Sequence, residues 1–216
     1  MPNPTEAAGR SGRRAQAARN DSAIVDAARA VFLDDPKAPV SAVASRAGVG
    51  ISALYRRYGG KEDLLRQICH DGLRRYLAQA QQALAADDGW QAFISFLRRL
   101  VDADLHSLTV HLAGSFAPTP EMAADAARAS ELAALVTRRA HESGRLRADV
   151  AASDIVLILE GCAAVRYPDA ERARLLRRRY LELQLAGLDT AGPATGSATG
   201  LPGPPASEEE IGRRWR

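Results

Sequence analysis

The sequence predicts an all-α fold, with a small N-terminal helix-turn-helix followed by a larger helical domain. Apolar residues recur at helical spacing through most of the chain, and no stretch alternates as a half-buried strand would. Segments rich in Gly, Pro and Asp separate these periodic stretches. With 216 residues, of which 46% are hydrophobic and 25% charged, the chain can bury a sizeable core.

The N-terminal segment, residues 1–18, is polar, basic and interrupted by Gly and Pro, so we expect a flexible arm. Two interpretations stay open: an ordinary solvated tail, or an arm whose arginines enter a minor groove. The first helix is expected from residue 20 or 21 to residue 33, with Asp21 as its N-cap. Prolines then break the chain, and we expect Pro39 in the first turn of the next helix.

Residues 40–59 form the most informative motif of the chain. A short helix leads into a turn, Gly48-Val49-Gly50, and a second short helix follows. This is the pattern of a helix-turn-helix, whose second helix lies in the major groove of DNA. The second helix carries hydroxyl and guanidinium groups, which bind phosphates and base edges. These groups belong to Ser52, Tyr55, Arg56 and Arg57. The sequence therefore predicts a DNA-binding regulator.

Five longer helices are expected after the Gly59-Gly60 turn. They span residues 61–85, 90–101, 121–142, 152–166 and 169–187, with a less regular stretch over 105–116. Ser153 or Asp154 is the expected N-cap of the fourth of these helices. Together the elements predict a DNA-binding domain over 19–66, a ligand-binding and dimerisation domain over 67–188, and a Gly/Pro-rich tail with a short terminal helix over 189–216.

Charge and composition narrow the class of protein. Residues 1–62 hold ten Lys/Arg and six Asp/Glu, a net charge of +4, whereas the other 154 residues have a net charge of −1. The positive excess therefore accompanies the helix-turn-helix and favours attraction to a polyanion. No apolar run is long enough to span a bilayer, and the N-terminus lacks a secretory signal. We expect a cytoplasmic, nucleoid-associated protein with no membrane partner.

The order of these parts resembles the TetR-type (TetR/AcrR-like) transcriptional regulators, and in particular actinobacterial-type members. Residues 47–65 read AGVG-x-S-x-LYRRY-x-x-KEDLL, whereas the family typically shows AGVS-x-GTLYRHF-x-x-KEDL. The match is specific over residues 19–66 and extends over 67–187 in helix order only. The resemblance implies a homodimer whose two helix-turn-helix motifs bind a near-palindromic operator, and a small molecule that releases a repressor from this DNA.

The resemblance also implies roles for individual residues at the DNA. Tyr55, Arg57 and Lys61 occupy positions that contact phosphate in the family, and Ser41 occupies a backbone or base contact. The positions that face base edges are held by Gly50, Ile51, Ser52 and Ala53.

Two of these positions depart from the family pattern. Gly50 and Ala53 replace the usual serine and threonine, so two hydroxyl groups are missing. We expect recognition to shift toward contacts between apolar side chains and thymine methyl groups. Arg56 and Ser52 then become the main polar readers.

The second domain offers candidates for an effector pocket. Aromatic and aliphatic side chains at helical spacing favour an apolar cavity between helices, although the same stripe is also typical of an ordinary core. The candidates are Trp90, Phe93, Phe96, Leu97, Leu100, His111, Phe116 and Glu160. Glu160 lies among apolar neighbours and could pair with an arginine, face a dimer partner or bind a cationic ligand. The last two helices, residues 152–187, are the expected dimer interface.

The sequence gives little support to an enzyme. It contains no phosphate loop, no GxSxG, no HExxH and no Cys/His metal spacing, so we predict no catalytic residues, no cofactor and no metal. The alternative interpretation is a helical protein-interaction module, or a nucleoid-associated DNA binder without a small-molecule ligand.

Overall fold

The computed structural model describes residues 20–107, 112, 115–191, 204–207 and 209–210. Within these residues the secondary structure consists of helices, turns and one isolated bridge between Leu146 and Asp189, which confirms the all-α fold class. The chain divides into two compact units, residues 1–68 and 69–216. The predicted basic arm and most of the predicted tail lie outside the described residues; at the start of the predicted terminal helix, Glu209 and Glu210 are described and helical.

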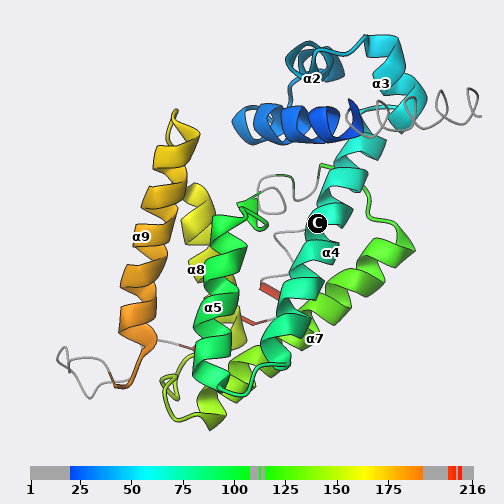
Figure 1. The fold of residues 1–216 in the computed structure, drawn as a ribbon. Coiled ribbons are helices and arrows are strands. Elements are labelled where there is room, and N and C mark those ends of the chain that lie inside the picture. The colour runs from blue at the N-terminus through cyan, green and yellow to red at the C-terminus, as the bar shows by residue number, and fades with distance from the viewer. Residues whose placement is uncertain (1–19, 108–111, 113–114, 192–203, 208, 211–216) are drawn as a thin grey trace, which may run out of the picture. The chain divides into compact units, whose positions relative to one another are not determined.

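The first unit contains a helix over residues 20–34, then α2 (Val40–Ala47), α3 (Ile51–Tyr58) and the start of α4 (Lys61–Leu84) (Figure 1). Helices as short as α2 and α3 are not stable in isolation. Their geometry therefore depends on a shared core to which all four segments contribute. The core residues are Ile24, Ala28, Phe32, Val43, Leu54, Tyr58, Leu64 and Leu65.

The turn between α2 and α3 depends on one glycine. Gly48 has a φ of +66°, in the left-handed region that side chains disfavour. Its N–H donates to the carbonyl of Ser45, and the N–H of Val49 donates to the carbonyl of Ala44. These bonds satisfy the last carbonyls of α2, as at other left-handed helix ends. Gly48 therefore ends α2 and lets the chain turn into α3.

The helix starts differ in detail from the predictions. Asp21 lies inside the first helix and not at its N-cap. Its carboxylate pairs with Arg57 of α3 instead. The residue expected to cap its own helix therefore makes a contact with a different helix. Pro39 is the N-cap of α2 and does not enter its first turn, because Val40 is the first helical residue.

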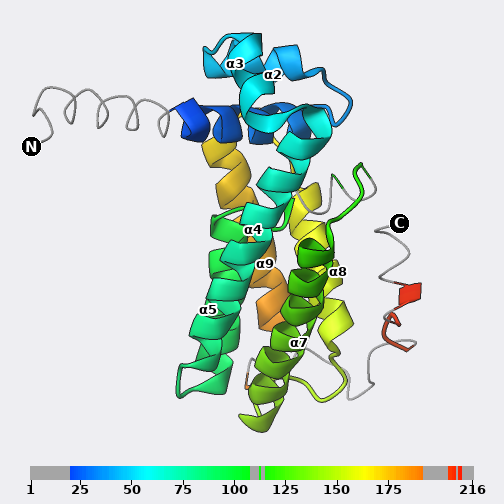
Figure 2. The ribbon, with the colours of Figure 1, turned by 90° about the vertical axis from the view of Figure 1, so that its right-hand side faces the viewer.

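The second unit is formed by the rest of α4, α5 (Gly89–Asp102), α7 (Pro120–Glu142), α8 (Ala152–Ala164) and α9 (Ala170–Leu188) (Figure 2). α5 and α8 each pack against both α7 and α9. Side-chain oxygens of Asp88, Thr119 and Asp169 accept hydrogen bonds from the first turns of α5, α7 and α9. The first turns of these three helices are therefore each capped by the side chain that precedes the helix.

The start of α8 is a correction. Neither Ser153 nor Asp154 is its N-cap, because Ala151, two residues before Ser153, is the N-cap and the helix begins at Ala152. Asp154 acts from the third helical position, where its carboxylate accepts the N–H of Ala151 at 2.8 Å. A carboxylate in the first turn also interacts favourably with the helix dipole.

The large apolar side chains of the last helix lie in two environments. Leu181 and Leu185 are buried in α9, whereas Leu175 and Leu183 are 47% and 63% exposed. On α8, Leu157 is 40% exposed. The two helices therefore leave large apolar side chains on the outside of the unit. In the part of the chain that the structure describes, no helix has the length and apolar character that a bilayer crossing requires.

Candidate nucleic-acid interface

α3 presents two different faces. Leu54 and Tyr58, one helical turn apart, are buried against the rest of the first unit. Ser52, Tyr55 and Arg56 are exposed at positions directed away from that core. Ile51, at the start of the helix, is 39% exposed although it is a large apolar side chain. The exposed face therefore combines hydroxyl groups, a guanidinium and an apolar group.

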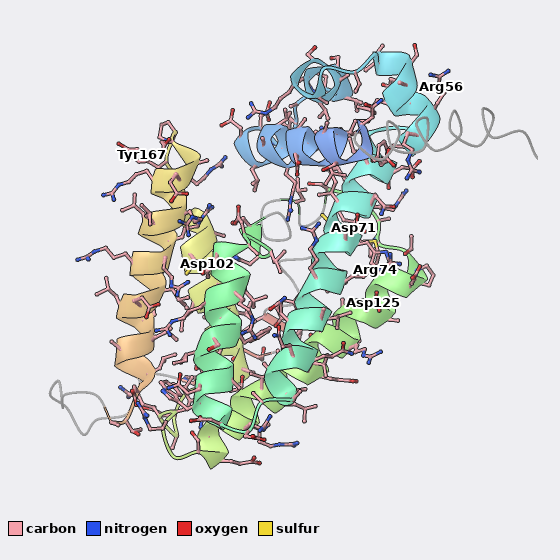
Figure 3. All side chains as sticks on the ribbon, viewed as in Figure 1. Arg56, Asp71, Arg74, Asp102, Asp125 and Tyr167 are labelled. Carbon is pink, nitrogen blue, oxygen red and sulfur yellow. The ribbon has the colours of Figure 1, made fainter. Side chains whose placement is uncertain are left out.

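The structure brings the predicted DNA contacts together on α3 and its ends, with Ser41 separate on α2. Ser41, Gly50, Ile51, Ser52, Tyr55, Arg56 and Arg57 are exposed, and Ala53 and Lys61 are half-buried. Gly50 is the N-cap of α3, and its carbonyl accepts the N–H groups of Ala53 and Leu54. Arg56 projects outward from α3 and forms no ion pair with another described residue (Figure 3).

Arg57 is held by an acidic partner that the sequence analysis did not identify. Its Nε donates to both carboxylate oxygens of Asp21, at 3.0 and 3.1 Å. The hydrogen bond and the charge of Asp21 raise the pKa of Arg57 above its usual value. Since the contact uses only Nε, the N–H groups of the two terminal nitrogens stay available. With the Arg57 side chain 60% exposed, Asp21 orients it without burying it.

Lys61, for which a phosphate contact is predicted, uses most of its hydrogen-bond donors within the first unit. Its Nζ donates to the carbonyls of Pro36 and Ala38, at 2.9 and 2.8 Å. The ammonium also lies 5.1 Å from the centroid of the Phe32 ring. Two of its three N–H donors are therefore used inside the first unit. The structure gives Lys61 a role in holding the segment before α2 against α4, and one donor remains for phosphate.

The predicted effector residues lie mostly in the hydrophobic core of the second unit. Five of the eight are at most 4% exposed: Trp90, Phe93, Phe96, Leu97 and Leu100. Trp90 stacks on Phe93, with ring centroids 5.8 Å apart. Phe116 and Glu160 are half-buried, and His111 lies outside the described residues. Of the two interpretations of the aromatic stripe, the ordinary core is therefore the one that fits these five buried side chains.

A surface pocket of the second unit involves other residues. It lies where the turn before α5 meets the end of α7, and only Trp90 belongs to the predicted effector set. The lining residues are Asp87, Asp88, Gly89, Trp90, Arg139, Glu142, Ser143 and Arg145. Arg145 covers the Trp90 ring, with its guanidinium carbon 5.4 Å from the centroid, and pairs with Asp189 at 2.5 Å. Opposite charges and one shielded aromatic ring give this pocket little apolar surface.

Sequence reasoning also missed a cluster in the second unit. Glu121 and Asp125 follow His70 by 51 and 55 positions along the chain, but the three side chains lie close together in space. No motif connects them, and only the packing of α4 on α7 could reveal the group.

Comparison with known proteins identifies the family of this chain. The family model "Bacterial regulatory proteins, tetR family" matches residues 24–68, and the model "Transcriptional regulator SbtR-like, C-terminal domain" matches residues 88–190. The HTH-type transcriptional repressor LfrR of Mycolicibacterium smegmatis is 34% identical over 113 residues, which are 49% of this chain and 57% of LfrR. The matched part of this curated relative is thus little more than half of its length.

Solved structures agree with this fold over a longer stretch. LfrR from Mycobacterium smegmatis in complex with proflavine is 26% identical with a TM-score of 0.53, over 83% of this chain and 99% of that chain. The regulator SCO0520 from Streptomyces coelicolor is 23% identical with a TM-score of 0.55, over 79% and 99%, and supports the fold alone. Both units thus match the same kind of protein, and the chain belongs to the TetR family of bacterial transcriptional regulators.

Proposed function

We propose that this protein is a ligand-responsive DNA-binding regulator that acts as a dimeric repressor. The exposed face of α3 carries this proposal. Ser52 and Arg56 offer hydrogen-bonding groups to base edges, and Ile51 offers an apolar contact to thymine methyl groups. Leu54 and Tyr58 anchor the opposite face in the core, which fixes the orientation of these readers.

The contacts to the DNA backbone complete the proposed interface. Tyr55 and Arg57 bind phosphates, and the carboxylate of Asp21 holds Arg57 in place for this contact. Ser41 and the remaining donor of Lys61 add weaker phosphate contacts. Gly50 and Ala53 lack hydroxyl groups and let α3 approach the base edges closely.

We propose that residues 152–187 form the dimer interface. Leu157 on α8 and Leu175 and Leu183 on α9 are exposed apolar side chains, which a second copy would remove from water. Two copies would then present two α3 helices to the half-sites of a near-palindromic operator, about 34 Å apart.

We propose that a small molecule bound in the second unit releases the DNA. LfrR has been solved with proflavine, which supports a similar effector site here. Because Trp90, Phe93, Phe96, Leu97 and Leu100 pack tightly in this structure, an effector that reaches them must displace them. Among the described residues, the half-buried Phe116 and Glu160 are the other members of the proposed site.

A regulator of this kind acts on the nucleoid in the cytoplasm and catalyses no reaction. An interaction module without DNA binding is less favoured, since it would have no use for an exposed arginine and hydroxyl groups on α3.

The DNA flanking the gene for this protein provides the first test. Fluorescence anisotropy is measured on this DNA and on random DNA at several salt concentrations, with the matched variants Arg56→Ala and Arg57→Ala. We expect Arg57→Ala to weaken binding to both DNAs and to lower the salt slope by about one. Arg56→Ala should mainly reduce the preference for the operator, by about 1–3 kcal/mol.

Two results would contradict the proposal. The first is equal affinity of the wild type for flanking and random DNA, together with failure to enrich any site from random sequence. The second, which concerns the assignment of the readers, is an equal loss on both DNAs for Arg56→Ala.

A further inference from the structure

Three side chains of metal-ligand type meet between α4 and α7 in the second unit. The ligand atoms of His70, Glu121 and Asp125 all lie within 4.8 Å of one another. The Nε2 atom of His70 is 2.9 Å from Oδ2 of Asp125. Among the described residues, no other three His, Cys, Asp or Glu side chains meet in this way. The cluster plays no part in the proposed DNA interface or effector site.

The backbone holds these ligands at a defined spacing. Glu121 and Asp125 are four residues apart on α7, so both carboxylates lie on one face of this helix. His70 faces them from α4. At the other end of the same helix pair, Arg139 of α7 donates to the carbonyls of Leu84 and Ala86, at 2.6 and 2.5 Å. The two helices are therefore tied together well away from the cluster, which preorganises the ligand atoms.

The donor set selects a class of cation. One imidazole nitrogen and two carboxylate oxygens suit Zn²⁺, Co²⁺, Ni²⁺ or Mn²⁺, whereas Mg²⁺ and Ca²⁺ prefer oxygen ligands alone. Zinc binds such atoms at about 2.0–2.2 Å, so neighbouring ligand atoms lie roughly 3–3.5 Å apart around the ion. The distance between His70 and Asp125 is close to this spacing. The site remains open to water, because the side chains of His70, Asp125 and Glu121 are 12%, 26% and 68% exposed.

We propose that His70, Glu121 and Asp125 form a binding site for a divalent transition-metal ion that links α4 to α7. The proposal concerns metal binding alone and does not depend on DNA binding. The site is of interest for function because His70 belongs to α4, the helix in which the division between the two units falls.

A competing cation makes the proposal testable. Arg74 of α4 forms an ion pair with Glu121 at 2.9 Å, and its side chain is 52% exposed. An exposed arginine can move into water at little cost. Glu121 would therefore exchange Arg74 for the metal, and removal of Arg74 should strengthen metal binding. If the cluster served only as an ionic link between helices, loss of Arg74 would weaken that link and have no effect on metal affinity.

Isothermal titration of the full-length, chelator-treated protein with Zn²⁺ alone is the direct test, and Co²⁺ absorption reports the ligand geometry. We expect one ion per chain and at least a tenfold loss of affinity in His70→Gln and in Asp125→Asn. The second variant keeps the shape of Asp125 and a hydrogen-bond acceptor, so it should preserve the fold, which circular dichroism checks. Arg74→Ala should bind several-fold more tightly than the wild type.

The matched control is His141→Gln, which removes an imidazole outside the cluster; the Nε2 atom of His141 contacts the carbonyl of Val150. It should bind Zn²⁺ like the wild type. The proposal is overturned if the wild type binds no Zn²⁺. It is also overturned if His70→Gln and Asp125→Asn bind Zn²⁺ as tightly as the wild type.

Discussion

The two units use side chains of their helices in opposite ways. In the first unit, eight-residue α3 keeps Leu54 and Tyr58 in the core and exposes Ile51, Ser52 and Arg56. In the second unit, α5 buries five of the eight side chains that sequence analysis assigned to an effector site, among them Phe93 and Leu97. The α3 residues predicted from the motif to contact DNA are therefore accessible to solvent. The α5 residues predicted from the aromatic stripe to bind an effector belong to the hydrophobic core.

The difference reflects the kind of information in each signal. A helix-turn-helix motif specifies a turn and two helix faces, so the exposed positions follow from the spacing of Gly48 and Leu54. An aromatic stripe states only that one face is apolar. Such a face can pack against neighbours or line a cavity, and packing density decides between them.

Truncation of an aromatic side chain in the second unit should have the largest effect. Phe93 is 1% exposed and stacked on Trp90. We expect Phe93→Ala to lower the free energy of unfolding by about 3–5 kcal/mol, because it leaves a cavity in a packed core. Urea unfolding followed by circular dichroism measures this loss. Phe116→Ala, at a half-buried site, is the control and should cost less. A loss below about 1 kcal/mol for Phe93→Ala would instead indicate that Phe93 lines an open cavity.

Removal of the Lys61 ammonium should have the next largest effect and act on the first unit. Lys61→Met leaves the carbonyls of Pro36 and Ala38 without a charged donor, so we expect a loss of about 1–3 kcal/mol in urea unfolding. Lys37→Met is the matched control, since Lys37 is an exposed lysine of the same unit, and it should change stability by less than about 0.5 kcal/mol. If Lys61→Met kept full stability but lost affinity for all DNA, the phosphate contact would be its main role.

Alkaline pH should weaken the second unit through a buried thiol. Burial raises the pKa of Cys162 to about 11, with a smaller opposing effect from Arg177. The unfolded thiol has a pKa of about 8.5. The thiol therefore contributes stability that is fully present below pH 8.5 and is lost as the pH rises toward 11. Between pH 8 and pH 10.5, the midpoint of urea unfolding should fall further for the wild type than for Cys162→Ala. An equal fall of the midpoint in the two proteins would exclude this contribution.

The smallest expected change in stability concerns the ion pair of the first unit. Asp21→Asn weakens an exposed pair, so we expect at most about 1 kcal/mol in urea unfolding. Its effect on DNA affinity should be clearer, because Arg57 loses the partner that orients it. Anisotropy of Asp21→Asn, Arg57→Ala and the double variant tests this by a mutant cycle. Additive losses of binding energy would show that Asp21 does not act through Arg57.

The sequence by itself determined the helical class, most helix boundaries to within a residue or two, and the solvent-exposed side of α3. These features depend on local signals: apolar periodicity, Gly48 in a tight turn, and capping residues such as Asp88 and Asp169. Local signals act through backbone sterics and through hydrogen bonds between residues close in the sequence, so a single segment of the chain is enough to identify them.

Only the tertiary structure decided which polar groups meet. It placed Asp21 on Arg57, directed Lys61 to two backbone carbonyls, and brought His70 of α4 to Glu121 and Asp125 of α7. It also packed the predicted effector stripe into the core and left Leu183 exposed. These contacts join residues far apart in the chain, and their distances depend on how whole helices pack, which the residue pattern of any one helix does not specify.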